Sequence, residues 1–563
     1  MIFRATAPRR FYMILVSAFC CAAAAALGCR RDQPILDVEL LAKAQPDECF
    51  VGVGNPNNVY PWDPQTDTCS NGRLKVNESY LWGMTKADNH IWMGTGANII
   101  CLLRRFAAAD GPQENGSYVC EFGSSAFSPP LAAASGDWRM PSIYRYDTIG
   151  GILDDMTGTL DDAALMLLNG TVGLRSATNH GGLVFLGGPA LGAGVNLFVF
   201  DAGTGAFLSA AAFPEFDNIR KWLSVDGVLY TAVKMADKTG AVLRWTGDAV
   251  NPFQFDVIAS LGSEGANLTL HDGRLFVTTW AQIEEVDEPV QSALYMSPVI
   301  PPGGLTAAHA EQWRMVWTVD QYEPDPVTRF TYAGGDLVSY QGYVVWATIH
   351  VPRLAAIVHV SVYGEPESDE ALGEIQTNTH RALHVFRGRL ASAANAQAEP
   401  NLDVELLYGE TTLPVWNPNA GDGGAWQVQP NNMGVEPMCG PSGFGNSANT
   451  YGWALAVYQD RLFLGTGDFS YEAQTGGTPP DADDFVPAFW GADLYRFDSL
   501  NEPAVPEFTD GAGNFLNLGV RNLIADDALY VGMGNFFNKL ADPNDHLPEG
   551  GWELLRLTLP NGS

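Results

Sequence analysis

The chain alternates apolar and polar residues in short runs that tight turns separate. One pattern recurs about seven times: an apolar strand, a turn of Asp, Asn or Gly residues, and a second strand of the form aromatic-aliphatic-small-small. Period-two alternation on both sides of such a turn predicts a β-hairpin. The predicted hairpins begin at Gly83, Leu174, Lys221, Leu268, Leu337, Leu455 and Asn522.

A third strand is predicted after several hairpins, at the stretches that begin at Ser142, Asn196, Ala241, Ala492 and Trp552. Repeated units of three or four strands predict the blades of a β-propeller. We therefore expect an all-β fold, a seven-bladed β-propeller over residues 78–563, with a long turn-rich insertion near 365–449. Chain length leaves open a division into two domains near residue 320.

Each predicted second strand contains one aromatic residue, followed two places later by a small residue. The small residues are Gly94, Gly187, Ala232, Thr278, Thr348, Gly465 and Gly532. Blades wedge together near the propeller axis, where a large side chain would clash, so packing accounts for the small size. We read these glycines as structural, not as phosphate-binding loops.

The N-terminus carries a basic segment, residues 1–10, followed by an apolar run over residues 11–27. This pattern predicts a signal peptide over residues 1–28. It ends in Ala26-Leu27-Gly28-Cys29, which resembles the lipobox of bacterial lipoproteins, and the resemblance implies that Cys29 carries a lipid anchor. An ordinary cleaved signal would instead leave Cys29 as a thiol. Either reading predicts export, with the anchored form in the periplasm or at the outer membrane of a bacterium.

Residues 29–77 are rich in Pro, Asp and Asn and predict a tether and lead-in with a short helix near 35–44. Neighbouring cysteines suggest two disulfides, Cys49 with Cys69 and Cys101 with Cys120, which leaves Cys439 free. Other connectivities stay open, because pairing cannot be read from sequence.

Composition supports the all-β reading, since 17% of residues are charged and the chain holds 60 Gly and 15 Trp. The formal net charge of −33 would repel phosphate backbones, so nucleic acid is not an expected partner.

Several segments resemble a group of exported bacterial propeller proteins with no assigned activity. They are YLWGM, YGWAL and GVRNL, each followed by an aromatic-aliphatic-glycine strand, together with NNMG and GPSGFGN. The likeness covers most of the chain after the signal and implies a fold but no function. The stretch DAGTG at Asp201 is similar to a blade motif of quinoprotein-type propellers, yet no adjacent cysteine pair follows the signal and no tryptophan-docking pattern recurs.

Inner strands of a propeller begin at the face where second strands end, so both line one mouth of the central channel. Counting back from the marker aromatics gives Trp82, Arg175, Arg220, Asp336 and Trp453 at equivalent positions, with Arg521 one place later. Four or five places after the marker aromatics come Lys234, Trp280, His350, Asp468 and Asn535. Guanidinium groups and flat rings suit a carboxylated or hydroxylated ligand such as an acidic sugar. The alternative is that these residues pin neighbouring blades through salt bridges.

Other candidate chemistry is weaker. The segment with His380 and His384 predicts a strand, on which residues four apart lie about 13 Å apart and cannot share a metal. Acidic clusters at 154–155 with 161–162, at 481–484 and at 542–545 offer calcium ligands or are solvated turns, and none has EF-hand spacing.

We expect a lipid-anchored module that binds or scaffolds an unknown protein or carbohydrate partner. No catalytic residue is assigned. The alternative is a glycoside hydrolase or lyase that acts on an acidic sugar in the channel.

Overall fold

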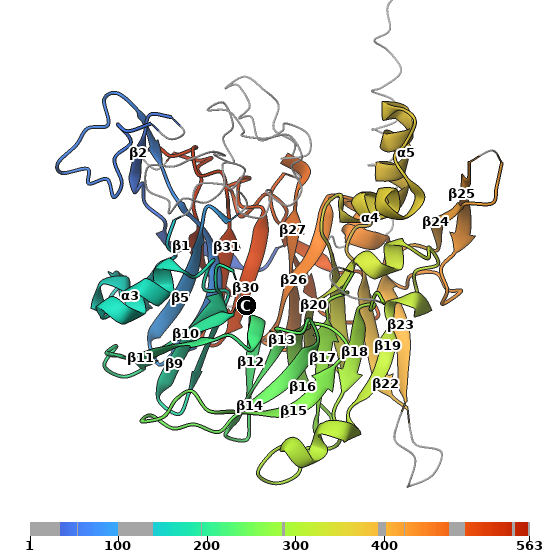
Figure 1. The fold of residues 1–563 in the computed structure, drawn as a ribbon, viewed down its shortest axis with the longest axis horizontal. Coiled ribbons are helices and arrows are strands. Elements are labelled where there is room, and N and C mark those ends of the chain that lie inside the picture. The colour runs from blue at the N-terminus through green and yellow to red at the C-terminus, as the bar shows by residue number, and fades with distance from the viewer. Residues whose placement is uncertain are drawn as a thin grey trace, which may run out of the picture.

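The computed structural model describes residues 34–52, 55–99, 139–192, 194–283, 288–391, 401–421, 423–471, 490–542 and 546–560. The chain folds as a β-propeller, as the repeats predict (Figure 1). Within the described residues the main strand pairings form seven antiparallel units of four strands. All seven predicted hairpins are present as the first two strands of a unit.

The first four units follow one another along the chain. Unit 1 has β4 (Glu78–Ala87), β5 (His90–Ala97), β6 (Ile143–Asp147) and β7 (Ile152–Asp155). Unit 2 has β8 (Ser176–His180), β9 (Leu183–Pro189), β10 (Val195–Asp201) and β11 (Phe207–Phe213). Unit 3 has β12 (Phe216–Val225), β13 (Val228–Met235), β14 (Gly240–Trp245) and β15 (Phe255–Leu261). Unit 4 has β16 (Gly265–His271), β17 (Arg274–Thr279), β18 (Ala293–Met296) and β19 (Arg314–Thr318).

The remaining units contain the insertions and the closing strand. Unit 5 has β20 (Tyr332–Tyr340), β21 (Tyr343–His350), β22 (Val385–Leu390) and β23 (Leu402–Tyr408). Unit 6 has β26 (Asn449–Tyr458), β27 (Arg461–Asp468), β28 (Leu494–Phe497) and β29 (Val505–Phe508). Unit 7 has β30 (Gly519–Ala525), β31 (Leu529–Gly534), β32 (Glu553–Thr558) and β1 (Asp37–Lys43).

The first strand of the chain completes the last unit. β1 pairs antiparallel with β32, so that Val38 lies opposite Leu557. The predicted helix near 35–44 is therefore wrong, and the expected tether 29–77 contains a strand of the propeller. The segment has no strong period of its own; the open edge of β32 supplies backbone partners that favour the extended form.

Turn chemistry fixes the inner hairpins. The first turn residue has a positive φ at Asp226 (48°), Asp272 (46°) and Gln341 (49°), and a glycine of positive φ follows each. Two consecutive positive φ values match the twist of the flanking strands, which explains the Asp-Gly and Gln-Gly pairs in the repeats.

Each inner strand contacts the inner strand of the next unit, and β30 of unit 7 contacts β4 of unit 1. The units therefore form a closed ring. The core consists of apolar layers between neighbouring units: Trp92, Leu174 and Phe198, for example, are fully buried between units 1 and 2. The small residues of the second strands are needed here, since a Cβ on Gly94 would lie 2.4 Å from Cβ of Leu174.

Most of the long connections lie at one end of the units, where inner strands begin and second strands end, whereas the β18–β19 connection, residues 297–313, lies at the other end. We call the first end the loop face and the opposite end, which carries the inner hairpin turns, the hairpin face. On the loop face lie α3 (Asp162–Asn169), α4 (Leu354–Tyr363), α5 (Asp369–Thr379) and the hairpin of β24 (Thr412–Asn417) and β25 (Ala425–Pro430) (Figure 1). No helix in these described parts is long and apolar enough to span a membrane.

The expected single insertion at 365–449 is in fact two, because β22 and β23 belong to unit 5. The strand predicted around His380 and His384 begins only at Val385, since α5 extends to Thr379. Buried polar contacts hold both insertions on the loop face. Arg381 Nε lies 2.8 Å from Oε2 of Glu323, and the backbone N–H of Trp416 donates to Asp325 at 2.9 Å.

Near the N-terminus, β2 (Glu48–Phe50) pairs with β3 (Arg73–Lys75). The expected disulfide joins Cys49 and Cys69, with their Cα atoms 5.4 Å apart. Cys101 and Cys120 lie outside the described residues, and Cys439 is free.

The tight contact between units 6 and 7 makes a stability prediction. A Cβ at position 465 would lie 2.1 Å from Cγ1 of Val520, so Gly465→Ala should lower the free energy of unfolding by about 1–3 kcal/mol through overpacking. Urea unfolding measures this. Gly373→Ala is the control: position 373 on α5 has no atom within 4 Å, and alanine there should be neutral or stabilising. Equal stability of the Gly465→Ala protein would contradict the proposed contact.

Candidate functional site

β-Bulges in the inner strands set the positions of the candidate residues. The register shifts between Leu81 and Gly83 in β4, and equivalent shifts occur in β12, β16, β20, β26 and β30. Bulges redirect side chains and are frequent beside functional sites. The residues that the shifts leave unpaired include Trp82, Arg220, Asn267, Asp336, Trp453 and Arg521.

Arg521 stands one place later in the sequence repeat than the other candidates. The bulge in β30 nevertheless leaves it unpaired at the same point of the inner strand as Trp82 and Trp453. In unit 2 the equivalent residue, Arg175, directly precedes β8. The inner strands thus present one candidate residue per unit. A sequence count that assumes regular strands cannot register these shifts.

The three arginines each lie over a tryptophan ring of a neighbouring unit. The guanidinium carbon is 4.8 Å from the ring centre of Trp82 for Arg175 and 5.6 Å from that of Trp453 for Arg521. Arg220 lies 3.8 Å from the ring centre of Trp280. Such cation–π contacts stabilise a partly desolvated cation and hold its plane in one orientation.

Hydrogen bonds link two of the arginines through residues that the sequence did not single out. Arg175 donates to Oδ1 of Asn218 at 3.1 Å, and Asn218 donates to Oε1 of Glu264 at 2.6 Å. Arg220 forms an ion pair with the same Glu264 oxygen. The buried Glu264 is charged, because Arg220 and Arg175 lower its pKa despite the opposing effect of burial.

Arg521 differs from the other two. Among the residues that the structure describes it makes no hydrogen bond and no ion pair, and its buried Nε has no acceptor. Nε of Arg175 also lacks one. Burial first and the charge of Arg220 second lower the pKa of Arg521 to about 10. The same two causes lower the pKa of Arg175. The three cations are therefore close enough to repel one another.

Aromatic side chains fill the space around these cations. Tyr80 stacks on Trp82 at 5.9 Å between ring centres and meets Trp453 edge-on at 5.8 Å. Tyr451 meets Trp453 at 5.0 Å. Tyr80 and Trp453 belong to units 1 and 6, which are not neighbours, so their contact bridges the side of the ring formed by unit 7.

Asp336 is a brace. Its carboxylate lies 2.5 Å from Nζ of Lys221 and accepts the backbone N–H of Leu455 at 2.9 Å. These contacts join units 3, 5 and 6. For this residue the alternative reading, an ion pair that pins units, describes the geometry, although the partner is a lysine and not an arginine.

His350, Asp468 and Asn535 do not join the arginines. Buried His350 lies 3.0 Å from Oγ1 of Thr348 and 4.3 Å from the ring of Tyr332. Asp468 accepts from Asn446 at 2.7 Å, and Asn535 donates to the carbonyl of Glu549 at 2.9 Å. The polar partners of these three residues therefore lie in their own surroundings and not in the arginine group, and a shared mouth that includes them stays a prediction.

The acidic clusters act locally where they are described. Asp161 caps α3 by accepting from Ala164 at 2.8 Å, and Asp154 pairs with Arg145 at 2.8 Å. Residues 481–484, 544 and 545 lie outside the described residues. Within the part of the chain that is described, no three His, Cys, Asp or Glu side chains come together as a metal site. Calcium binding stays an untested prediction.

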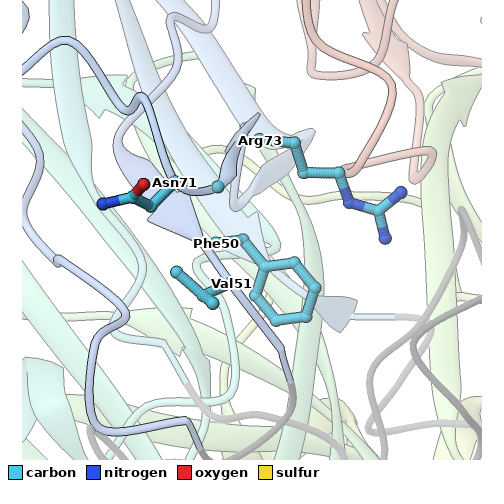
Figure 2. A pocket seen from close by; sticks show the side chains of 5 residues that line it. Phe50, Val51, Asn71 and Arg73 are labelled. Atoms are coloured by element: carbon cyan, nitrogen blue, oxygen red, sulfur yellow. The ribbon is translucent and has the colours of Figure 1, made fainter.

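A separate hollow of about 260 Å³ lies beside the disulfide, lined by Phe50, Val51, Asn71, Gly72 and Arg73. Figure 2 shows Asn71 and Arg73 extending to opposite sides of Phe50. The Phe50 ring has Nζ of Lys539 at 4.8 Å from its centre. No sequence pattern predicted this hollow, which depends on the disulfide-bonded loop.

Comparisons with known proteins concern the fold alone. No family model and no curated protein matches the chain. Among solved structures it is similar to the Dos1 propeller, at 8% identity over 85% of this chain and 93% of that one, with a TM-score of 0.38. It is also similar to the propeller of the Trilobed protease from Pyrococcus furiosus, at 8% identity over 81% and 92%, with a TM-score of 0.32. These values carry no argument about function.

Buried carboxyls near the loop face make folding sensitive to pH. Burial raises the pKa of Glu78 to about 8 and that of Asp493 to about 7. In the unfolded chain these groups ionise near pH 4. Between pH 4 and 8 the folded state therefore binds more protons than the unfolded state, and stability falls as pH rises.

We expect the melting temperature to fall by several degrees between pH 5 and pH 8.5, and Glu78→Gln to reduce that fall. Glutamine has the shape of the protonated acid and carries no charge at high pH. Thermal melts in a pH series measure the effect. Glu374→Gln on the exposed side of α5 is the control and should leave the pH dependence unchanged. A Glu78→Gln protein with the wild-type pH profile would contradict the assignment.

Proposed function

We propose that this protein is an exported, lipid-anchored binding module, a seven-bladed propeller whose loop face takes a small carboxylated ligand at the arginine group Arg175, Arg220 and Arg521. An acidic sugar is the ligand class that this group suits best. The signal peptide and the lipobox resemblance support the anchor at Cys29 and a location in the periplasm or at the outer membrane.

The observation that carries the proposal is the unfilled hydrogen-bonding capacity of Arg521. A partly buried guanidinium without a carboxylate partner is costly, and in a chain of net charge −33 acidic partners are abundant. A ligand carboxylate would supply the missing partner of this cation and offset the cost of its burial. Arg175 adds a second open donor at Nε.

The aromatic surroundings support a sugar rather than a simple anion. Trp82 and Trp453 carry two of the arginines on their ring faces, and Tyr80 lies between them. Flat rings present apolar faces for sugar C–H groups, while arginine forks bind a carboxylate in two places.

Binding is favoured over the enzyme alternative because the nearby carboxylates are already used. Glu264 is neutralised by Arg220, and Asp336 is neutralised by Lys221. A glycoside hydrolase needs one acid that can donate a proton and a second carboxylate beside the scissile bond. Among the described residues around the arginine group, no such pair is available.

A thermal-shift titration of the domain that follows Cys29, with D-galacturonate and D-glucuronate as probes, tests the proposal. Either acid should raise the melting temperature by several degrees through mass action, and neutral D-galactose should not. Arg521→Gln should weaken binding at least tenfold. Arg389→Gln, at an exposed position on β22, is the matched control and should bind normally. Absence of any shift with both acids would contradict the proposed ligand class.

The stability of the unliganded variants separates a ligand site from pinning of the units. Arg521→Met should leave the free energy of unfolding unchanged or raise it, because the substitution removes a poorly satisfied cation. Glu264→Gln should lower it by about 1–3 kcal/mol, because Arg220 loses its buried partner. Urea unfolding measures both. A strongly destabilised Arg521→Met protein would favour the pinning role.

A further inference from the structure

The first strand enters the propeller from the hairpin face. Asp37 of β1 lies opposite Thr558, whereas Lys43 lies opposite Glu553. Leu557, next to Thr558, pairs with Leu529, the first residue of β31 after the inner turn of unit 7. The start of β1 is therefore at the hairpin end of the sheet, and its end is at the loop face.

The chain is fixed to the domain just before β1. The backbone N–H groups of Ile35 and Leu36 donate to Oε2 of Glu507 at 2.9 and 3.1 Å. Glu507 is buried and forms an ion pair with Arg496. The chain is therefore fixed from Ile35 onward, at the outer rim where units 6 and 7 meet.

The connection between Cys29 and the folded domain is short. Five residues lie between Cys29 and Ile35, and the six Cα–Cα steps, fully extended, span at most about 21 Å. β1 itself covers about 20 Å from Asp37 to Lys43 at the strand rise. A lipid on Cys29 can therefore reach little beyond the edge of the sheet at the loop face. On the side of unit 5, α4, α5 and the β24–β25 hairpin project from the loop face (Figure 1).

We infer that the anchored protein sits with the hairpin-face end of units 6 and 7 next to the bilayer, so that the arginine group on the loop face opens away from the membrane. The inference rests on the proposed anchor at Cys29. It deepens the proposed function, because it presents the ligand site to molecules that arrive from the aqueous side and not to membrane lipids.

Energy transfer to the membrane surface tests the orientation. The full-length lipidated protein is reconstituted in phosphatidylcholine vesicles that contain an acceptor-labelled lipid. A Cys439→Ser background removes the known free thiol and sets the labelling baseline. A donor is attached at Arg389→Cys, near the hairpin end of β22, or at Glu374→Cys on α5. Both positions are exposed and belong to unit 5, so they differ mainly in height.

Transfer should be at least twofold more efficient from position 389 than from position 374. Inserting twelve Gly and Ser residues between Arg31 and Asp32 should reduce the difference in transfer between the two positions, because a longer linker permits other orientations of the domain. Equal transfer, or more transfer from position 374, would overturn the orientation. Failure of the anchor itself is distinguishable: the protein would not bind vesicles and would behave like Cys29→Ser, and this result would overturn the proposed anchor together with the orientation.

Discussion

The structure depends on burial of both faces of every four-stranded unit against its neighbours. Layers such as the one around Trp92, Leu174 and Phe198 lie between units, so no unit has a core of its own. The ring can close only if the units approach closely at their inner strands, which is why glycine stands at positions 94 and 465. Pairing of β1 with β32 then joins the first segment of the chain to the last unit and removes an open edge.

Ring closure also produces the candidate site. Inner strands that converge on an axis bring together residues from distant parts of the chain, and the bulges aim their side chains at one another. Most of these groups neutralise each other: Asp336 with Lys221, and Glu264 with Arg220. Arg521 stays unpaired among the described residues and lies on Trp453. A strongly acidic protein thus keeps a local concentration of positive charge within an aromatic surround.

The two ends of the ring differ for a reason of connectivity. Inner hairpins close through two-residue turns, which leave no room for insertions. Connections at the loop face have no such limit, and there the chain adds α4, α5 and β24–β25. The ion pair of Arg381 with Glu323 ties the segment after α5 to the connection between units 4 and 5. The loop face therefore has most of the long connections, and such loops usually carry binding.

The sequence by itself determined most of the strands and the seven hairpins, because these follow from local alternation and turn chemistry. It suggested the Cys49–Cys69 pair from spacing, and it placed Arg175 and Arg220 at equivalent positions of the repeat. Only the tertiary structure decided the rest. Residues 35–44 become a strand because β32 offers an open edge. His350 bonds to Thr348 on its own strand, and Asp468 and Asn535 bond to residues of nearby loops. The isolation of Arg521 and the role of Glu264 depend on bulges and on contacts between units that are distant in sequence, and no local pattern records such contacts.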